Sequence, residues 1–418
     1  MRRIERHRFT PRRTAGTLVK AVQNYSHIVV GAGALGTAAA YWLARSGARD
    51  VLVLEQFELG HDRGASEDHS RIIRHSYHSS DYTALTPSAY ATWAELEDET
   101  SLKLVVKTGG LDLAREGTDG VHEIDNYRHS LRTAGIDWDD LDAAAIRGRY
   151  PQWRIDDDVV GMYQRDTGLV DIRRANAAHL ARARQMGVTV KPHTRVTDVR
   201  SSDTEVTIVA GDEIYTAESA VLCVASWLPR LASALGLAWT ITLSEEQVTY
   251  FATPHLRQFA PDRFPVFIWH GDDLFYGFPV YGEAAVKLSR DMRGAWTTLE
   301  ERSYEIDHDE ELYIQRFAER YLPEAVGPIL YSKSCVYDMP PDRDFVIDLV
   351  PGHPRLALGI GAGHAAKFAS VIGQALAQLS LTGSSDHPIT PFALDRPALT
   401  NPHFTPTFRL QGEPVRGI

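Results

Sequence analysis

Residues 27–36 of the chain, HIVVGAGALG, decide its fold. The first four form a short β-branched run, which is typical of a buried strand in a parallel sheet. Residues 34–46 then carry apolar side chains at helical spacing, and Gly47 stands where a glycine commonly ends a helix. Residues 51–54, VLVL, are the next buried run. Together these segments predict a compact β-α-β unit with a glycine-rich loop at its first turn.

The glycines of this loop follow the spacing Gly-x-Gly-x-x-Gly. Gly31 permits the tight turn, Gly33 lets the backbone approach a pyrophosphate, and Gly36 lets helix and strand pack closely. The start of the helix offers unpaired N–H groups to phosphates, and an acid after the second strand accepts hydrogen bonds from ribose hydroxyls. The pattern predicts a dinucleotide site built from Gly31, Gly33, Ala34, Leu35, Gly36 and Glu55. It does not distinguish FAD from NAD.

Buried runs of the same kind recur at residues 220–224 and 356–360, and the second leads into another glycine-rich stretch. Between them lie a helical pattern over residues 80–165 and several strand patterns over residues 240–292. We therefore expect an α/β protein of two domains in an α+β arrangement. One is a Rossmann-like nucleotide-binding domain assembled from separated segments, and the other is built from the insertions.

The composition is that of an ordinary globular protein, with 418 residues, 44% hydrophobic and 24% charged. The net charge of −11 argues against a nucleic-acid partner, because contacts to phosphate need a basic face. The two cysteines, Cys223 and Cys335, make neither a disulfide framework nor a zinc site, so we expect no metal and a cytoplasmic location. No apolar run approaches the ~18 residues of a membrane helix, so we expect no membrane association.

The first 25 residues differ in kind from the rest. They hold six arginines and one lysine against a single acid, Glu5, and no apolar core follows the arginines as a secretory signal would require. A transit peptide is one interpretation of such a leader, and a disordered extension is the one we prefer.

Four basic residues flank loops rather than long helices: Arg71, Arg74, Lys287 and Lys367. The apolar neighbours of Arg71, Arg74 and Lys367 predict partial burial and hence a carboxylate partner for these three. Cys335 stands in the polar and aromatic stretch KSCVYD, two residues from Lys333. Its thiol is either a small buried hydrophobe or a functional group.

Taken together, these residues resemble the monomeric sarcosine oxidase and N-methyltryptophan oxidase family, in the D-amino-acid oxidase superfamily of flavoproteins. The resemblance extends from about Tyr25 to Pro397. It is carried by VVGAGALG (29–36), SRIIRHSY (70–77), FYGFPVYG (275–282) with Lys287, SCVYD (334–338), FVIDL (345–349) and GAGHAAKF (361–368). The glycine loop is common to many flavoproteins, whereas the SCVYD and SRIIR segments are more specific.

The resemblance implies a role for each matching residue. Cys335 matches the cysteine that links FAD covalently through its 8α carbon, and Arg71 matches the arginine against the flavin ring. Arg74 and Lys367 match the pair that binds the substrate carboxylate. Two further catalytic positions are Tyr276, near that carboxylate, and Lys287, beneath the flavin where oxygen reacts. The remaining cofactor contacts implied are Ser70, Val196, Gly361, Gly363 and His364.

The resemblance also implies a division of the chain. Residues 26–110, 166–236 and 335–395 would form an FAD-binding domain of the glutathione-reductase type. Residues 111–165 and 237–334 would form a substrate domain with an antiparallel sheet. Residues 396–418 would be a C-terminal tail, and residues 1–25 the basic extension.

The implied activity is oxidation of the C–N bond of a secondary amino acid, N-methyl or cyclic, to an imine, with O2 reduced to H2O2. The partners would be this small molecule and O2, in a monomer or weak dimer. Alternatives are a flavin dehydrogenase that passes electrons to another acceptor, a flavoenzyme of secondary metabolism acting on a larger amine, an NAD-dependent dehydrogenase and a non-catalytic scaffold. The cysteine segment argues against NAD, and the full set of basic residues argues against a scaffold.

Two departures from the family concern the substrate. Glu67 and Asp291 stand where the family has active-site histidines. One hypothesis is that their negative charge favours a substrate other than sarcosine, with a second cationic group. The alternative is that both carboxylates point to solvent and the pocket is merely wider.

Overall fold

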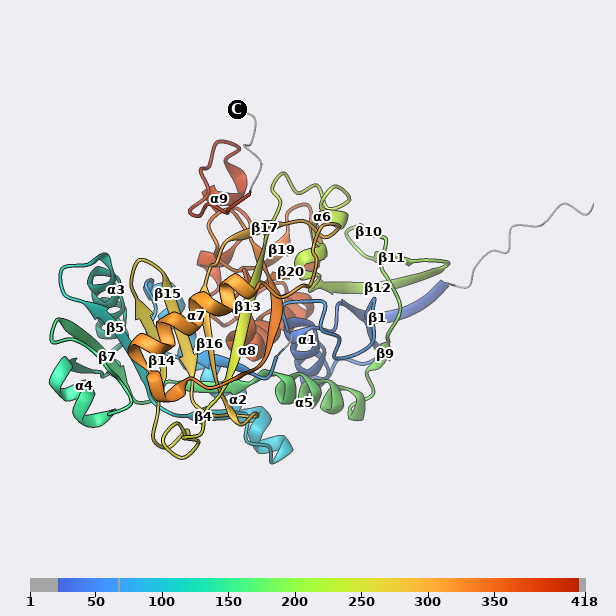
Figure 1. Ribbon diagram of the computed structural model, residues 1–418. Helices are drawn as coiled ribbons and strands as arrows, with labels where there is room; N and C mark the ends of the chain where they lie inside the picture. The colour runs from blue at the N-terminus through green and yellow to red at the C-terminus, as the bar shows by residue number, and fades with distance from the viewer. Residues whose placement is uncertain (1–21, 67, 413–418) are drawn as a thin grey trace, which may run out of the picture.

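The computed structural model describes residues 22–66 and 68–412 of the chain (Figure 1). Glu67 therefore lies outside the described residues, as do residues 1–21 and 413–418. The described chain is a mixed α/β structure with three sheets, of eight, nine and three strands. The two large sheets are the bodies of two lobes, as Figure 1 shows. The predicted fold class is confirmed.

The eight-stranded sheet carries the glycine loop. Its strands are β1 (Val22–Val30), β2 (Val51–Leu54), β9 (Thr189–Lys191), β10 (Asp198–Ser201), β11 (Val206–Ala210), β12 (Glu213–Leu222), β19 (Val346–Val350) and β20 (His353–Ile360). Strands β9, β2, β1, β12 and β20 are mutually parallel neighbours in that order. Strands more than one hundred residues apart in the sequence thus lie side by side in this sheet.

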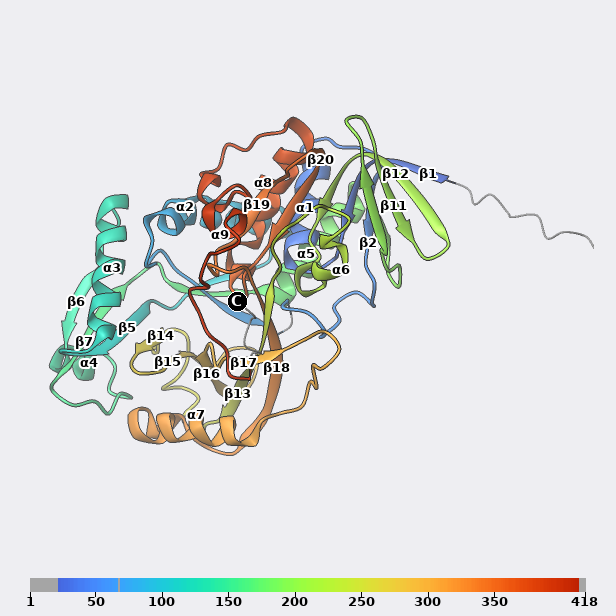
Figure 2. The same cartoon turned by 90° about the horizontal axis from the view of Figure 1, so that it is seen from above.

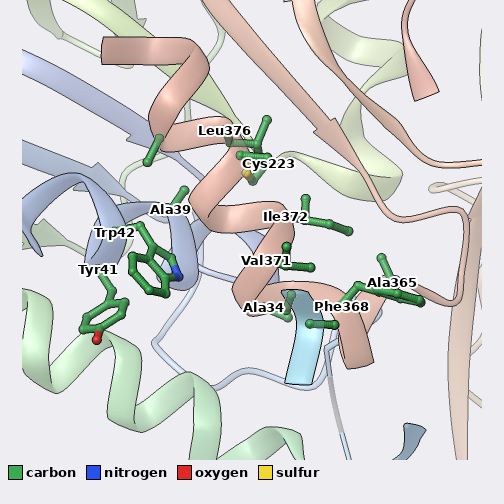
Figure 3. Packing of buried hydrophobic residues seen from close by; sticks show 14 of the residues in the cluster. Ala34, Ala39, Tyr41, Trp42, Cys223, Ala365, Phe368, Val371, Ile372 and Leu376 are labelled. Atoms are coloured by element: carbon green, nitrogen blue, oxygen red, sulfur yellow. The ribbon is translucent and has the colours of Figure 1, made fainter. Parts of the chain in front are cut away.

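Three helices cover one face of this sheet: α1 (Ala34–Arg45), α5 (Ile172–Gln185) and α8 (Ala369–Thr382). Helix α8 packs on α1, and Figure 3 shows its side chain Leu376 close to Cys223, which follows β12. Gly373 allows this approach, because a Cβ there would lie 2.4 Å from the Cβ of Ala38. The contact fixes α1, and with it the loop that precedes α1.

The nine-stranded sheet is the body of the other lobe. Its strands are β5 (Gly110–Arg115), β6 (Asp139–Asp142), β7 (Val159–Gln164), β13 (Thr242–Ala252), β14 (Val266–His270), β15 (Leu274–Phe278), β16 (Ala285–Asp291), β17 (Ala295–Thr297) and β18 (Ile329–Met339). All of its pairings are antiparallel except that of β5 with β14. An aromatic core that includes Phe267, Trp269, Phe275 and Phe317 lies between this sheet and α7 (His308–Tyr321).

The remaining elements are a small sheet and further helices. A three-stranded sheet pairs β3 (Ser70–Ile73), β8 (Gly168–Asp171) and β4 (Val105–Lys107). The other helices are α2 (Ser80–Thr100), α3 (Asp119–Ala134), α4 (Ala143–Arg149), α6 (Pro229–Ala232) and α9 (Pro397–Thr400). Helix α9 leads into the C-terminal segment, which Figure 2 shows running down beside β17. None of the described helices has both the length and the apolar character needed to cross a membrane.

Three expectations drawn from the sequence need correction. Strand β1 begins at Val22, so residues 22–25 belong to the sheet and not to an extension; β1 is prolonged by pairing with β12, which lies far away in sequence. Residues 80–165 are not all helical, since β4, β5, β6 and β7 alternate with helices there. Residues 335–339 pair with β13 in the nine-stranded sheet, so the boundary placed at 335 is too early.

A buried histidine in α5 generates a prediction about stability. His179 is fully buried between the rings of Tyr41 and Trp93, and neither ring nitrogen has a hydrogen-bond partner among the described residues. Burial lowers the pKa of His179 to about 3. The unfolded chain, with an ordinary histidine pKa near 6.5, therefore binds more protons, and folding stability falls as pH drops below about 6.5.

We expect His179→Phe to reduce this acid destabilisation, by up to about 1.4 kcal/mol for each pH unit between the two pKa values. The measurement is the midpoint of urea unfolding at pH 5 and pH 8. His403→Phe, at an exposed position, is the control. Equal acid sensitivity in wild type and His179→Phe would contradict the prediction.

Candidate functional site

The glycine loop packs directly on the carboxyl end of β12. Gly31 has φ of +97°, and a Cβ there would lie 2.3 Å from the carbonyl oxygen of Cys223. A Cβ on Gly36 would lie 1.9 Å from the carbonyl oxygen of Gly31. Both positions therefore exclude any side chain, and the reasons are those predicted for a tight turn and close helix–strand packing.

A cavity of about 410 Å³ opens at this loop. Gly31, Gly33, Glu55 and Val196 all line it. Among its other lining residues are four arginines: Arg173, Arg184, Arg195 and Arg230. The glycine backbone, an acid at the ribose position and the surrounding cations fit the phosphate and ribose parts of a dinucleotide.

Glu55 is held as an anion at the edge of this cavity. It accepts hydrogen bonds from the backbone N–H groups of Ala32 (2.7 Å) and Phe57 (2.9 Å), and His61 lies 3.5 Å away. Burial raises the pKa of Glu55, but these hydrogen bonds outweigh burial and leave it below its usual value. A fixed anionic acceptor of this kind suits vicinal hydroxyl groups.

A second cavity, of about 590 Å³, lies between the two lobes. Ala65 lines both cavities, so the two adjoin. The second cavity collects residues from the nine-stranded sheet, from β3 of the small sheet, and from the segments before β19 and after β20. Those predicted for the site and found in its lining are Arg71, Arg74, Tyr276, Lys287, Cys335, Gly363, His364 and Lys367, with Asp291 beside them.

Lys287, on β16, is 3% exposed, and its ammonium forms an ion pair with Asp68. Its Nζ lies 2.5 Å from Oδ2 of Asp68 and donates a hydrogen bond to the carbonyl oxygen of Ser70 at 2.9 Å. Tyr250 donates to the other oxygen of Asp68. Burial lowers the pKa of Lys287 to about 8, and Asp68 opposes that fall. Lys287 and Arg71 hold the pKa of Asp68 well below its usual range although its burial acts to raise it.

Arg74, which follows β3, and Lys367, in the segment after β20, both line the cavity and both lie near the ring of Tyr77. The guanidinium of Arg74 lies over the rings of Tyr77 (4.8 Å) and Tyr127 (5.0 Å) and 3.4 Å from Asp112. The ammonium of Lys367 lies 5.7 Å from the centre of the Tyr77 ring. Burial lowers the pKa of Lys367 to about 7, and Arg74 adds to this effect.

The predicted carboxylate partners are present for two of the three basic residues, Arg71 and Arg74. Asp68 lies 3.7 Å from Arg71 and also pairs with Lys287, and Asp112 pairs with Arg74. No carboxylate among the described residues lies within ion-pair distance of Lys367. Lys367 thus adds cationic charge next to Arg74, and an anionic ligand would relieve the mutual repulsion.

Cys335, on β18, stands opposite Glu246 in the register with β13. Burial raises the pKa of its thiol to about 12, while Arg71 opposes that rise. Tyr276, on β15, also faces the cavity, and burial raises the pKa of its hydroxyl. Both groups are therefore neutral at pH 7.

Asp291 does not point to solvent. It lines the cavity, where Arg343 lies 2.8 Å away and Tyr337 donates a hydrogen bond at 3.1 Å. Burial raises the pKa of Asp291, but Arg343 and Tyr337 outweigh burial and leave it below its usual value. The solvent-facing alternative is therefore wrong for Asp291, and its charge is already neutralised inside the protein. Glu67 lies outside the described residues.

His364 is fixed as a neutral donor. Its Nε2 lies 3.0 Å from the carbonyl oxygen of Arg343, which can only accept, so Nε2 carries the proton. Burial lowers the pKa of His364 well below its usual value, and Lys367 and Arg343 add to this effect.

Comparison with known proteins agrees with this geometry. The sequence pattern described as DAO, FAD dependent oxidoreductase, matches residues 26–379. The chain belongs to this family. Monomeric sarcosine oxidase of Streptomyces avermitilis is 34% identical over 385 residues, covering 87% of this chain and 96% of that protein. N-methyl-L-tryptophan oxidase of Escherichia coli is 30% identical over 384 residues, covering 89% and 99%.

Solved structures show the same fold. NikD, an unusual amino acid oxidase essential for nikkomycin biosynthesis, superposes with a TM-score of 0.77 at 24% identity, covering 89% of this chain and 98% of its own. Glycine oxidase from Geobacillus kaustophilus superposes with a TM-score of 0.77 at 18% identity, covering 90% and 99%. The dinucleotide of this DAO-family chain is therefore FAD and not NAD.

Some of the residues predicted for the site lie behind the residues that line the two cavities. Leu35, Gly36, Ser70 and Gly361 do not line either cavity. Ser70 holds Lys287, and Gly361 accepts the backbone N–H of His364 at 3.0 Å. Ala34 begins α1, where its N–H donates to Ser66.

The sequence analysis missed three residues that the structure places in the second cavity: Asp68, Arg343 and Phe408. Asp68 was available as an acid within the SEDHSRIIR segment, although nothing in the spacing selects it over Glu67. Arg343 and Phe408 carry no motif, and they join the cavity only through tertiary contacts.

The clash geometry at Gly36 leads to a prediction about cofactor binding. Gly36→Ala places a methyl group against the Gly31 carbonyl, so the loop must shift and retained FAD should fall at least tenfold. The measurement is flavin absorbance relative to protein absorbance after purification. Gly148→Ala is the control, because a Cβ there meets no atom within 4 Å. Normal FAD content in Gly36→Ala would contradict the prediction.

Proposed function

We propose that the chain oxidises the C–N bond of a secondary amino acid, N-methyl or cyclic, with O2 as the electron acceptor. The observation that carries the proposal is the second cavity, where an unneutralised cation, Lys367, adjoins Arg74 while Lys287 and Cys335 face the same space. The relatives named for sarcosine and N-methyl-L-tryptophan support the substrate class. Two fixed cations on one wall suit one carboxylate.

FAD, when bound, supplies the acceptor for two electrons and passes them to oxygen. The protein supplies position and charge. Arg74 and Lys367 would hold the substrate carboxylate, and Tyr77 and Tyr127 fix the guanidinium of Arg74 in turn. This orientation of the substrate accounts for much of the expected rate. Arg71 lies on the same wall and would adjoin the flavin ring.

Lys287 would be the oxygen site. A buried ammonium stabilises negative charge that develops on oxygen, because few waters compete with it. Asp68 and the Ser70 carbonyl fix its position. The proton on Nζ is essential to this role, and burial makes it easier to lose.

Cys335 would carry the covalent bond to FAD. Cys335 lines the same cavity as Lys287, and Arg71 acts to lower the pKa of its thiol and so favours the thiolate. A covalent anchor is consistent with a cofactor that spans two adjoining cavities.

A second candidate function is a dehydrogenase that uses another electron acceptor. The Asp68–Lys287 pair favours it, because the carboxylate offsets the positive charge that oxygen would meet. The proposal for O2 is preferred because Lys287 retains its proton at neutral pH, and peroxide formation distinguishes the two candidates.

The experiment that tests the function is a peroxide-coupled screen of N-methyl amino acids, cyclic imino acids and simple amines. We expect turnover only of compounds that bear a carboxylate, with stoichiometric peroxide. Anaerobic bleaching of the flavin without peroxide in air would establish the dehydrogenase instead. Failure of every carboxylate compound to bleach the flavin would overturn both candidates.

The proton on Lys287 predicts a pH dependence. Because its pKa is about 8, the ammonium is present below pH 8 and is lost above it. The rate constant for flavin reoxidation by O2 should therefore be flat below pH 8 and fall above it.

In Lys287→Met the rate constant for reoxidation should be lower by about a hundredfold and insensitive to pH in this range. Stopped-flow mixing of the anaerobically reduced enzyme with O2 measures both quantities. The anaerobic reduction step is the internal control, and an unchanged reoxidation rate in Lys287→Met would contradict the role.

The covalent bond is tested by acid precipitation. Wild-type protein should remain yellow in the pellet, whereas Cys335→Ser should release its FAD to the supernatant. Cys223→Ser, which changes the other cysteine, is the matched control and should remain yellow. Release of FAD from the wild type would show that the flavin is not covalently held.

A further inference from the structure

The C-terminal segment, residues 402–412, reaches the second cavity. Thr407 and Phe408 line it together with Arg74 and Lys367. The family pattern ends at residue 379, so this wall of the cavity lies outside the part of the chain that the family pattern matches. The segment is a feature of the site that family membership does not explain.

Hydrogen bonds fix the C-terminal segment on both sides of Phe408. The N–H of Thr407 donates to the carbonyl oxygen of Pro341 at 3.0 Å. The N–H of Gln411 donates to Gly294 at 2.7 Å, and Gln411 accepts from Trp296 at 3.0 Å. Leu410 is buried between these anchors. Phe408 is therefore held between two fixed points and is not on a loose end.

The two anchors belong to the loops that carry the Asp291–Arg343 pair. Gly294 follows Asp291 by three residues, and Pro341 precedes Arg343 by two. The ion pair joins these loops at the cavity, and the C-terminal segment joins them a second time. The backbone hydrogen bonds that position Phe408 thus also close the end of the cavity at which Asp291 and Arg343 lie.

The charges at this end are already matched. Arg343 pairs with Asp291 at 2.8 Å, and its guanidinium lies 5.8 Å from the centre of the Tyr337 ring. A second lining acid, Asp342, is paired with Arg396 at 2.6 Å. A charged group on a ligand would have to break one of these pairs, which is costly in a buried site.

The acid Asp344 also lines the cavity, and it accepts a hydrogen bond from Tyr82 at 2.8 Å. The rest of the cavity lining includes the apolar and aromatic side chains of Ile268, Leu274 and Tyr276. This surface favours apolar atoms, since their burial against aromatic rings is favourable and demands no counter-charge.

We propose that the C-terminal segment forms the distal wall of the substrate cavity, and that Phe408 selects secondary amino acids with a bulky, uncharged apolar side chain or N-substituent. The inference rests on the proposed function, because it takes Arg74 and Lys367 as the carboxylate site. It replaces the hypothesis of a second cationic group, since Asp291 is neutralised by Arg343.

The test measures ligand binding and not turnover. Purified FAD-bound protein is titrated with acetate, with indole-3-acetate, and with a carboxylate that carries a distal ammonium, and perturbation of the flavin spectrum gives each dissociation constant. Wild type should bind indole-3-acetate at least tenfold more tightly than acetate. Phe408→Ala should reduce that preference about tenfold, with acetate affinity unchanged.

Phe404→Ala is the matched control, because Phe404 is a half-buried phenylalanine of the same segment that does not line the cavity. Phe408→Trp fills more of the space and should move the preference toward acetate. If Phe408→Ala is unstable, Phe408→Trp still tests whether residue 408 sets the preference for the larger carboxylate.

Three results would overturn the inference: no aromatic preference in wild type, a preference that Phe408→Ala leaves unchanged, or tightest binding of the ammonium compound, which would point to the lining acid Glu123. A flavin spectrum that no carboxylate perturbs would count against the proposed function itself. The two failures are thus distinguishable.

Discussion

The structure depends on one close approach of backbone to backbone. At the carboxyl ends of β1 and β12, the glycine loop lies against the carbonyl of Cys223, and the first turn of α1 lies against the loop. No side chain fits at Gly31 or Gly36. Helix α8 then packs on α1 and fixes its direction. The two cavities adjoin next to this arrangement, because Ala65, on the loop after β2, lines both of them.

Charge is distributed unequally within the second cavity. Lys287, Arg74 and Arg343 each have a carboxylate partner, whereas Lys367 has none among the described residues. Buried cations with partners hold their geometry, and a buried cation without one creates a demand for an anion. Three cations of the second cavity are therefore held in place by carboxylates, and Lys367 is left to pair with an anionic ligand.

Local patterns in the sequence predicted the glycine loop well, because its glycine spacing forms a motif, although the residue that Gly31 approaches, Cys223, is far away in sequence. They also predicted that Arg71 and Arg74 need carboxylates, but not which ones. Asp68 and Lys287 are more than two hundred residues apart, and their pairing depends on how the two lobes meet. Phe408 could not be predicted, because the cavity that it lines is built from distant segments and no motif marks it. The helical interpretation of residues 80–165 failed because strands such as β4 and β5 gain their stability from distant partners.

The order of strands in the eight-stranded sheet has a consequence for biosynthesis. β1 is among the first described segments to leave the ribosome, yet its neighbour β12 pairs with β20, which ends at Ile360. Long-range parallel pairing is slow to form, and translation proceeds at about 5–20 residues per second. The glycine loop is therefore made many seconds before its sheet can close. FAD capture is then an event of the nearly complete chain, and nascent chains expose unpaired strand edges that chaperones would have to protect.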